Sequence, residues 1–295
     1  MIRGEAAIPP DGTKAQPRPP QPLPVGPTST QPPEHILRAF GATGGDLELL
    51  SGGQGRTWRS GNIVLKPVGE PAEASWLAST FEQLHVSGVR LARPVRSSDG
   101  RWVVAGWSAQ RFVSGSPAPR PDEILTAAQA LHDALAPLPE PRFLRGRTDL
   151  HSWADRLSWG DIDDVDGRTG SGHGARLFAA LADGRRPVAA PSQVVHGDMF
   201  GNVLFAGDAP PAIVDITPYW RPPAWAAGVI VVDALAWGGA PIELLAEGDR
   251  WPDWRQLLRR ALLFRLAVSL AHPLTPPSDL VTMLSTADRI APHLD

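Results

Sequence analysis

Hydrophobic and polar positions alternate in the first half of the chain in a way that predicts short strands. Residues 47–68 (LELLSGGQGRTWRSGNIVLKPV) alternate apolar and polar side chains around two glycine-bearing turns, a pattern typical of three antiparallel strands. Residues 71–88 change to a spacing of about 3.6 residues, which predicts a helix with one apolar face. Residues 89–113 return to strands around the turn SSDG. We therefore expect residues 47–113 to form a small antiparallel sheet that carries one helix.

Beyond residue 121 the hydrophobic spacing is mainly helical. The linker SGSPAPRP at residues 114–121 precedes the change. Asp122 is expected to cap the first helix, since a side-chain oxygen at that position can accept a backbone N–H. Two short apolar strands, in VVH and PAIVD, interrupt the helices between residues 194 and 215. Helices are predicted in the segments DEILTAAQALHDAL, TDLHSWADRLSW, GARLFAALADG, VVDALAWGG, WRQLLRRALLFRLAVSLA and DLVTMLSTADRIA.

The first 33 residues differ from the rest in composition. They contain ten prolines and few large apolar side chains, so they bury too little surface to offset the entropy of ordering. We expect residues 1–33 to be a disordered tail, and the segment PEHILRAFG to open the folded part as a short helix. The chain is therefore predicted to contain a β-rich lobe at residues 34–113 and a helical lobe at residues 114–295.

Composition and charge narrow the class of protein. The net charge is −3, with acidic and basic residues mixed along the chain; this argues against a nucleic-acid partner, because such proteins carry a basic stripe. No apolar stretch reaches the ~18 residues that cross a bilayer, and the first residues lack the apolar segment of a signal peptide. Cysteine is absent, which excludes disulfides and thiolate chemistry. We expect a soluble, cytoplasmic protein that binds neither nucleic acid nor membrane.

Lys66 is one of only two lysines among 28 basic residues. It follows the apolar residues of a predicted strand, and an edge-strand lysine with a solvated head is the ordinary interpretation. In a chain that otherwise uses arginine, a retained lysine favours a site that needs a compact ammonium instead of a planar guanidinium. Its expected partner is Glu73 at the start of the following helix, where a carboxylate also favours the helix dipole. Glu70 is the alternative partner.

Three polar residues follow apolar strands near residue 200. Asp198 and Asn202 lie in VVHGDMFGN, and Asp215 ends the strand PAIVD. Two carboxylates about 4 Å apart repel by roughly 4 kcal/mol at an effective dielectric of about 20, so such a pair near a core indicates a cation or a shared proton between them. An amide oxygen beside them suits Mg²⁺ better than zinc. The alternative interpretation is three independent turn residues, because Asp and Asn are common in turns.

Taken in order, the chain has a glycine-rich hairpin, a strand lysine, a helix glutamate, a linker, the motif HGDMFGN and the motif IVD. In this order, and over residues 35–295, it resembles the aminoglycoside phosphotransferase family, whose members phosphorylate small molecules. The resemblance implies an α+β, two-lobed protein-kinase-like fold, with a small antiparallel β lobe carrying one helix and a larger, mainly helical lobe. It also implies a phosphotransferase that moves the γ-phosphate of ATP or GTP to a hydroxyl of a small-molecule acceptor, with Mg²⁺.

The resemblance assigns roles to individual positions. Asp198 corresponds to the catalytic base, which accepts the proton of the acceptor hydroxyl. Asn202 and Asp215 correspond to the ligands of Mg²⁺. Lys66, steadied by Glu73, corresponds to the ammonium that neutralises phosphate oxygens.

Further positions are assigned to support and to nucleotide binding. His196 is expected to support the catalytic loop. Asp233 in VVDALAW resembles a buried helix aspartate that hydrogen-bonds this loop, and a charge in an apolar helix face is costly without such partners. The adenine is expected to meet backbone groups around Gln110, Phe112 and Val113.

Three features depart from the family pattern, and one is the short interval from Lys66 to Glu73, which would let the ion pair be absent or use Glu70. Three residues separate Asp198 from Asn202, where the family usually has four, and the turn SGGQG at residues 51–55 matches a phosphate-binding glycine loop poorly. The last two departures motivate a second hypothesis, a catalytically silent nucleotide-binding module. A third hypothesis is a metal-dependent hydrolase that uses His196, Asp198 and Asp215.

Two weaker signals concern the acceptor. Residues 161–167 (DIDDVDG) are interpreted as a solvated loop, and the alternative is an acidic collar for a cationic acceptor such as an amine-bearing sugar. Trp220 and Trp225 are interpreted as core residues, and the alternative is that they line the acceptor pocket.

Overall fold

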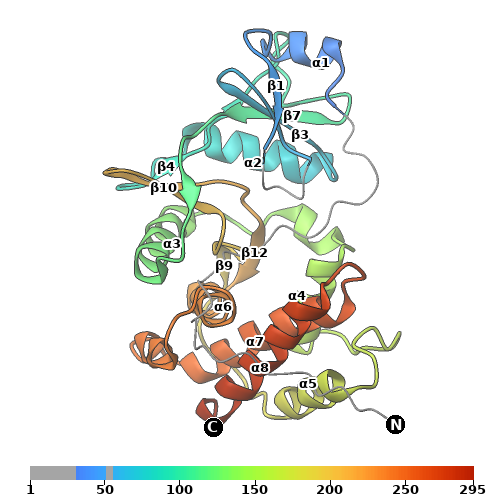
Figure 1. Ribbon diagram of the computed structural model, residues 1–295, viewed down its shortest axis with the longest axis vertical. Coiled ribbons are helices and arrows are strands. Elements are labelled where there is room, and N and C mark those ends of the chain that lie inside the picture. The colour runs from blue at the N-terminus through green and yellow to red at the C-terminus, as the bar shows by residue number, and fades with distance from the viewer. Residues whose placement is uncertain (1–30, 51–55) are drawn as a thin grey trace, which may run out of the picture.

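The computed structural model describes residues 31–50 and 56–295, which form two lobes (Figure 1). In Figure 1 the lobe from the first part of the chain lies above the helical lobe from the later part. The predicted α+β, two-lobed fold is therefore confirmed. Of the predicted tail, residues 1–30 lie outside the described residues, and so does the glycine-rich turn at residues 51–55.

A sheet of short strands forms the upper lobe. Its order is β1-β2-β3-β7-β5, with β6 paired to β7, and all of these pairings are antiparallel. Trp58 and Leu65 face each other across β2 and β3 and are both buried, with Ile36 of α1 in the same core. The predicted meander is therefore confirmed. The elements are α1 (Glu34–Ala39), β1 (Leu47–Leu49), β2 (Trp58–Ser60), β3 (Ile63–Pro67), α2 (Pro71–Gln83), β5 (Pro94–Val95), β6 (Val103–Val104) and β7 (Trp107–Arg111).

Helix α2 lies between the upper sheet and the lower lobe (Figure 1). It starts at Pro71, where a missing N–H costs nothing because the first helical N–H groups have no partner in the helix. The Glu70 side chain accepts a hydrogen bond from the backbone N–H of Ala72 at 3.0 Å and caps the helix. Phe81 near the other end packs into the core of the lower lobe. Helix α2 thus couples the two lobes.

A second sheet joins segments that are far apart in the sequence. Its order is β4 (Arg90–Leu91), β11 (Ala209–Ile213), β10 (Val203–Ala206) and β8 (Ser116–Pro117). The expectation that residues 47–113 form one self-contained antiparallel sheet is wrong at β4, which pairs parallel to β11. A two-residue strand has no periodicity of its own, and its partner lies more than a hundred residues away.

Gly115 allows the chain to pass close to β10 as it enters the lower lobe. Its backbone is left-handed (φ 139°), and a Cβ there would lie 3.0 Å from both the Leu204 Cβ and the Phe205 carbonyl oxygen. Only glycine tolerates this combination of conformation and close approach. The predicted linker is therefore held against β10 through β8.

Helices dominate the lower lobe, and α6 and α7 form its centre, with most of their residues buried. The expected cap at Asp122 is wrong: α3 begins at Pro121, and Asp122 lies inside the first turn. Across the part of the chain that is described, no helix combines the length and the apolar composition needed to cross a membrane. The helices are α3 (Pro121–Leu135), α4 (Leu150–Trp159), α5 (His173–Asp183), α6 (Pro223–Ala236), α7 (Trp254–Ala271) and α8 (Pro277–Ile290), with 3-10 turns at Arg142–Gly146, Ile242–Gly248 and Ala291–His293.

Strands β9 (Gln193–His196) and β12 (Pro218–Arg221) pair antiparallel at the centre of the lower lobe. After β9 the chain turns at Gly197, where a Cβ would lie 2.4 Å from the ring of Tyr219. Tyr219 in turn packs edge-on against Trp225 and Phe264. The glycine of the HGD motif is therefore required by the aromatic core beneath it, which determines where Asp198 leaves the strand.

Candidate functional site

Lys66 and Asp215 form an ion pair across the two lobes. Lys66 lies on β3 of the upper sheet, and Asp215 follows β11 of the lower lobe. Asp215 has a left-handed backbone (φ 50°), which is uncommon for a residue with a side chain and is typical of functional sites. Burial lowers the pKa of Lys66 to about 8, while the adjacent carboxylate favours its charged form. The two residues therefore share one inter-lobe cleft.

Two cavities meet at this ion pair. The front cavity, of about 310 Å³, is lined by Lys66, Asn202 and Asp215 and by the predicted adenine-binding residues Gln110, Phe112 and Val113. The rear cavity, also about 310 Å³, shares Lys66 and Asp215 with the front cavity and is lined as well by apolar side chains of α2 such as Leu77 and Phe81. The structure thus brings most of the predicted nucleotide and metal residues to one cavity.

Asp198 lies in the loop after β9, beside Asn202. The Asn202 Nδ2 donates to the Asp198 carbonyl at 2.7 Å and to its carboxylate at 3.3 Å. Gly201, in a left-handed conformation (φ 95°), allows the shortened loop to make this turn. The Asp198 side chain is 41% exposed, so its carboxylate is accessible to a ligand.

Arg265 of α7 contacts Asp198 directly, and this contact was not predicted. Its guanidinium donates to Asp198 Oδ1 at 2.7 Å and to Asp233 Oδ1 at 2.7 Å. Burial disfavours ionised Asp198, but Arg265 outweighs burial, so the pKa of Asp198 lies below its ordinary value. Burial raises the pKa of Asp233, and Arg265 opposes that rise. Asp233 was expected to hydrogen-bond the loop directly. Instead, Arg265 lies between them and donates hydrogen bonds to both Asp233 and Asp198.

One sequence signal for Arg265 exists. It stands between Phe264 and Leu266 in an otherwise apolar stretch of helix, as Asp233 does in VVDALAW. Opposite charges in two apolar helices indicate a buried pair, because either one alone would be costly. Because nearly all basic residues of this chain are arginines, an arginine at position 265 did not stand out by residue type.

His196 is buried under the loop instead of facing the cleft. Its Nδ1 accepts hydrogen bonds from the backbone N–H groups of Asp198 and Thr217 at 3.2 and 3.3 Å. The His132 Nε2 accepts the backbone N–H of His196 at 3.1 Å. Burial lowers the pKa of His196 to about 4 and that of His132 to about 3. Both rings are therefore neutral acceptors at neutral pH, consistent with support of the loop.

The expected pairing of Lys66 with Glu73 is wrong for this structure. Within the described ranges, the Lys66 ammonium forms its ion pair with Asp215, and Glu70 caps α2. Burial raises the pKa of Glu73 while the nearby Arg147 lowers it. The short interval after Lys66 leaves Glu73 in the first turn of α2, where the charge of Arg147 acts on it.

Three solved structures share this architecture. An amicoumacin kinase, hAmiN, in complex with AMP-PNP, Ca²⁺ and Ami is 11% identical, with 88% of this chain and 92% of that chain covered and a TM-score of 0.55. The aminoglycoside phosphotransferase APH(4)-Ia, as a thermostable mutant, is 14% identical, with coverage of 88% and 97% and a TM-score of 0.52. A microcompartment-associated aminopropanol kinase is 17% identical, with coverage of 84% and 93% and a TM-score of 0.54.

The chain has the aminoglycoside phosphotransferase fold. At the level of sequence, no family model matches it, and no curated protein does. The resemblance seen in the motifs HGDMFGN and IVD is thus confirmed for the fold over most of the chain.

Asn202 and Asp215 are the oxygen donors at the front cavity that could hold a divalent metal. Asn202 and Asp215 both line the front cavity, and the Asn202 amide nitrogen is engaged by Asp198, so its oxygen is the atom left for a metal. Residues 31–50 and 56–295 contain no cluster of three or more His, Cys, Asp or Glu side chains placed to hold a metal. Mg²⁺ needs only one or two protein oxygens when water and phosphate complete its shell.

The hydrolase hypothesis does not fit this donor set. His196 uses Nδ1 for two backbone N–H groups inside the core. No metal-binding cluster with Asp198 and Asp215 is formed among the described side chains.

The weaker signals are resolved as well. Trp225 is fully buried beside Tyr219 and Phe264, so it is a core residue, while Trp220 lines a separate polar cavity. In the acidic loop, Asp161 pairs with Arg221 at 2.7 Å. Asp164 accepts hydrogen bonds from its own turn, which favours the interpretation as an ordinary loop.

Proposed function

We propose that the protein is a phosphotransferase that moves the γ-phosphate of ATP to a hydroxyl of a small molecule with Mg²⁺; GTP is the alternative donor. The observation that carries the proposal is the contact between Lys66 and Asp215 at a cavity that Asn202 also lines. Each of the three structures compared above is of a protein named as a kinase or phosphotransferase, and one contains AMP-PNP and Ca²⁺. These neighbours support the reaction class.

The front cavity fits the nucleotide. Its volume of about 310 Å³ lies at the lower end of small-ligand sites, which run from roughly 300 to 1,000 Å³. The adenine would lie against Gln110, Phe112 and Val113. The Lys66 ammonium would exchange the Asp215 carboxylate for phosphate oxygens, and Asp215 and Asn202 would then be available to Mg²⁺. When bound, the metal neutralises charge on the phosphates.

Asp198 would act on the acceptor. Its carboxylate is accessible, and Arg265 keeps it ionised, so it can accept a hydrogen bond and then the proton from the acceptor hydroxyl. Phosphoryl transfer depends mainly on positioning and electrostatics. The hydrogen bonds from Arg265 and Asn202 hold the carboxylate in one orientation, which is the positioning this step requires.

The test is nucleotide binding followed by turnover. Mg²⁺ with AMP-PNP at 100-fold above its dissociation constant should stabilise the full chain by about 2.7 kcal/mol, a shift that thermal denaturation detects. Lys66→Met and Asp215→Ala should reduce the shift. Asp198→Asn should keep it and lose transfer of the γ-phosphate to a small-molecule acceptor. No stabilisation by any nucleotide in the wild type would overturn the proposal.

The second candidate is a catalytically silent nucleotide-binding module. It is favoured by one observation, namely that both carboxylate oxygens of Asp198 are engaged, one by Arg265 and the other by Asn202. It predicts the same stabilisation by nucleotide without phosphoryl transfer or ATP hydrolysis. Slow hydrolysis that is lost in Asp215→Ala would exclude it.

A further inference from the structure

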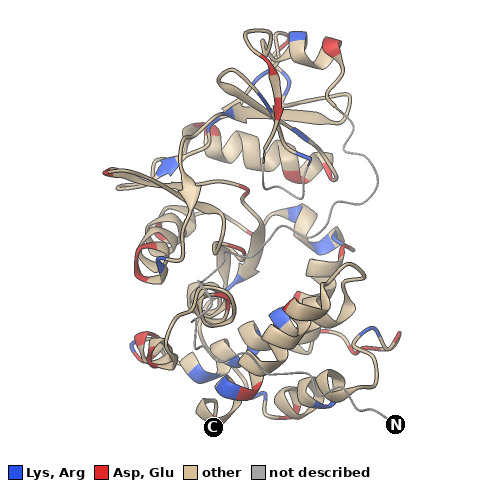
Figure 2. Cartoon of the chain, viewed as in Figure 1, with Lys and Arg blue, Asp and Glu red and all other residues tan. Residues whose placement is uncertain are grey.

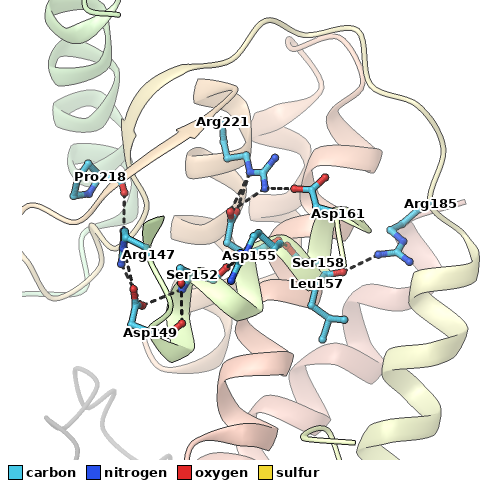
Figure 3. Close-up of polar contacts among 11 residues, drawn as sticks. Arg147, Asp149, Ser152, Asp155, Leu157, Ser158, Asp161, Arg185, Pro218 and Arg221 are labelled. Atoms are coloured by element: carbon cyan, nitrogen blue, oxygen red, sulfur yellow. Dashed lines mark hydrogen bonds and ion pairs between the residues drawn. The ribbon is translucent and has the colours of Figure 1, made fainter. Parts of the chain in front are cut away.

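A polar cavity of about 280 Å³ in the lower lobe lies beside the catalytic loop, and we call it the arginine pocket. Tyr219 lines it and also packs against Gly197, one residue before Asp198. The pocket lies among the 3-10 turn Arg142–Gly146, α4 and β12 of the lower lobe, and Figure 3 shows polar contacts of several of these residues. Its walls include four arginines and three acids: Arg145, Arg147, Arg156, Arg221, Glu140, Asp155 and Asp161.

Each acid of the arginine pocket is already bound by a guanidinium. Figure 3 shows Arg221 pointing toward both Asp155 and Asp161, with donor–acceptor distances of 2.9 and 2.7 Å. Glu140 pairs with Arg145 in the same way. A cationic ligand would have to compete with these guanidiniums for every carboxylate of the pocket.

Four guanidiniums and three carboxylates line the pocket, and Arg147 pairs with a further acid, Asp149, at 2.9 Å, so Arg156 is the lining arginine that forms no ion pair within the described residues. Arg156 donates to the Ser152 carbonyl at 3.3 Å. Arg185 donates to the Leu157 carbonyl at 2.8 Å (Figure 3). Neither of them, nor Arg260, forms an ion pair with another described residue. Burial lowers the pKa of Arg260 to about 10, and Arg185 and Arg221 add to the decrease.

The surface charge of the whole molecule does not share this excess. Figure 2 shows basic and acidic positions interspersed over both lobes, and the net charge is −3. A local excess of guanidinium in an acidic protein is costly, because like charges repel. It is stabilised when an anion binds, and guanidinium groups hold carboxylate and phosphate through paired hydrogen bonds.

Tyr219 adds a neutral donor to the arginine pocket. Its side chain is 4% exposed, and its hydroxyl makes no hydrogen bond with any other residue in the described ranges. Burial raises the pKa of Tyr219, so the hydroxyl keeps its proton and can donate it to an anion. The Tyr219 hydroxyl is thus a hydrogen-bond donor in the wall of the pocket that is nearest the catalytic loop.

We propose that the arginine pocket binds a carboxylate or phosphate group of the acceptor molecule. The assignment to the acceptor rests on the proposed function; the anion site itself does not. The acceptor is then an anionic hydroxy compound and not a polyamine sugar. Arg156 and the Tyr219 hydroxyl are the anchors, because their donors are the ones left unused by carboxylates.

The experiment measures anion binding to the full chain without nucleotide. Inorganic phosphate and malonate are titrated separately, with spermidine as the cationic probe, and the thermal midpoint is followed. We expect at least one anion to raise the midpoint and spermidine to leave it unchanged; the two anions distinguish a phosphate from a carboxylate site. Arg156→Gln should weaken the effective anion about tenfold. Arg38→Gln, which removes a distant exposed charge on α1, should not.

A second pair of variants separates this site from the nucleotide cleft. Lys66→Met should keep anion binding, whereas Tyr219→Phe should weaken it. Binding that is lost in Lys66→Met and kept in Arg156→Gln would overturn the proposal, as would stabilisation by spermidine alone or by none of the probes. If Arg156→Gln lowers the midpoint of the free protein, Arg156→Lys replaces it, since it keeps the charge and removes the planar guanidinium, and weaker anion binding is still expected. Failure of nucleotide binding with anion binding intact would overturn the proposed function only.

Discussion

The guanidinium of Arg265 lies 2.7 Å from the carboxylate of Asp198, although 67 residues separate the two in the chain. The same guanidinium also contacts Asp233 of α6. The buried guanidinium donates hydrogen bonds to both carboxylates. Without Arg265, the buried carboxylate of Asp233 would be a costly unpaired charge. The orientation of the proposed base is therefore determined by the packing of α7 against α6.

Replacing Arg265 should change the pH dependence of the reaction. In Arg265→Gln the pKa of Asp198 should rise, because the guanidinium that lowers it is gone. The acid limb of the rate profile should then move to higher pH, and kcat should fall by about tenfold or more as positioning is lost. The KM for nucleotide should change little. Steady-state kinetics between pH 5 and 9 check this, with Arg265→Lys expected to restore part of the rate.

An unchanged acid limb in a folded Arg265→Gln would contradict this mechanism. Arg38→Gln serves as the matched control, because its ion pair with Glu34 is exposed and lies in the upper lobe.

Arg265 and Asp233 should be energetically coupled. Removing one partner of a buried ion pair costs about 3–5 kcal/mol, because the other charge is left unpaired. Arg265→Met and Asp233→Leu should each lower the free energy of unfolding by about this amount, and the double variant by much less than the sum. Urea denaturation of the four proteins measures the coupling. Strict additivity would mean that the two side chains stabilise the fold independently.

Stability should fall in mild acid because of two buried histidines. The folded pKa values of His132 and His196 are about 3 and about 4, below the value of about 6.5 in an unfolded chain. Protonation therefore favours unfolding, and the stability present above pH ~6.5 is lost as the pH falls toward 4. At pH 5 the loss should be roughly 2 kcal/mol for each histidine.

Thermal denaturation between pH 5 and 8 measures this dependence. His132→Gln removes one titrating ring and should reduce the slope of midpoint against pH below 6.5. Equal slopes in wild type and His132→Gln would exclude a contribution from His132.

A methyl group at position 197 should disturb the catalytic loop. In Gly197→Ala the new Cβ would lie 2.4 Å from the Tyr219 ring and 3.1 Å from Trp225. Such overpacking costs about 1–3 kcal/mol, and the displaced loop should lose activity beyond the loss of stability. Gly44→Ala is the control, because a Cβ there meets no atom within 4 Å. If both variants keep full activity and stability, the aromatic core does not position Asp198.

The spacing of apolar and polar residues predicted the strands and helices whose formation depends on residues close together in the sequence. The alternation around Trp58 and Leu65 indicated the meander, since a strand with one buried face must alternate. The scarcity of lysine drew attention to Lys66, and the motifs HGDMFGN and IVD indicated Asp198, Asn202 and Asp215. The structure brings Lys66, Asn202 and Asp215 to one cavity.

Pairings between distant residues were missed. Glu73 was expected beside Lys66, but side-chain direction in the first turn of α2 depends on how the helix packs between the lobes. Arg90–Leu91 was assigned to the wrong sheet, because a short strand does not encode its partner. Arg265 was not predicted as a partner of Asp198, since its apolar neighbours Phe264 and Leu266 indicate burial but do not identify the carboxylate that it contacts.

The sequence by itself determined the order of strands and helices and the chemical groups available to the cleft, because periodicity and residue type are local properties. Only the tertiary structure decided that Asp215 pairs with Lys66, that Arg265 holds Asp198, and that Arg156 lines the arginine pocket without an ion pair among the described residues. Charges find partners through space, so burial and proximity, which the fold alone creates, determine which pairs form.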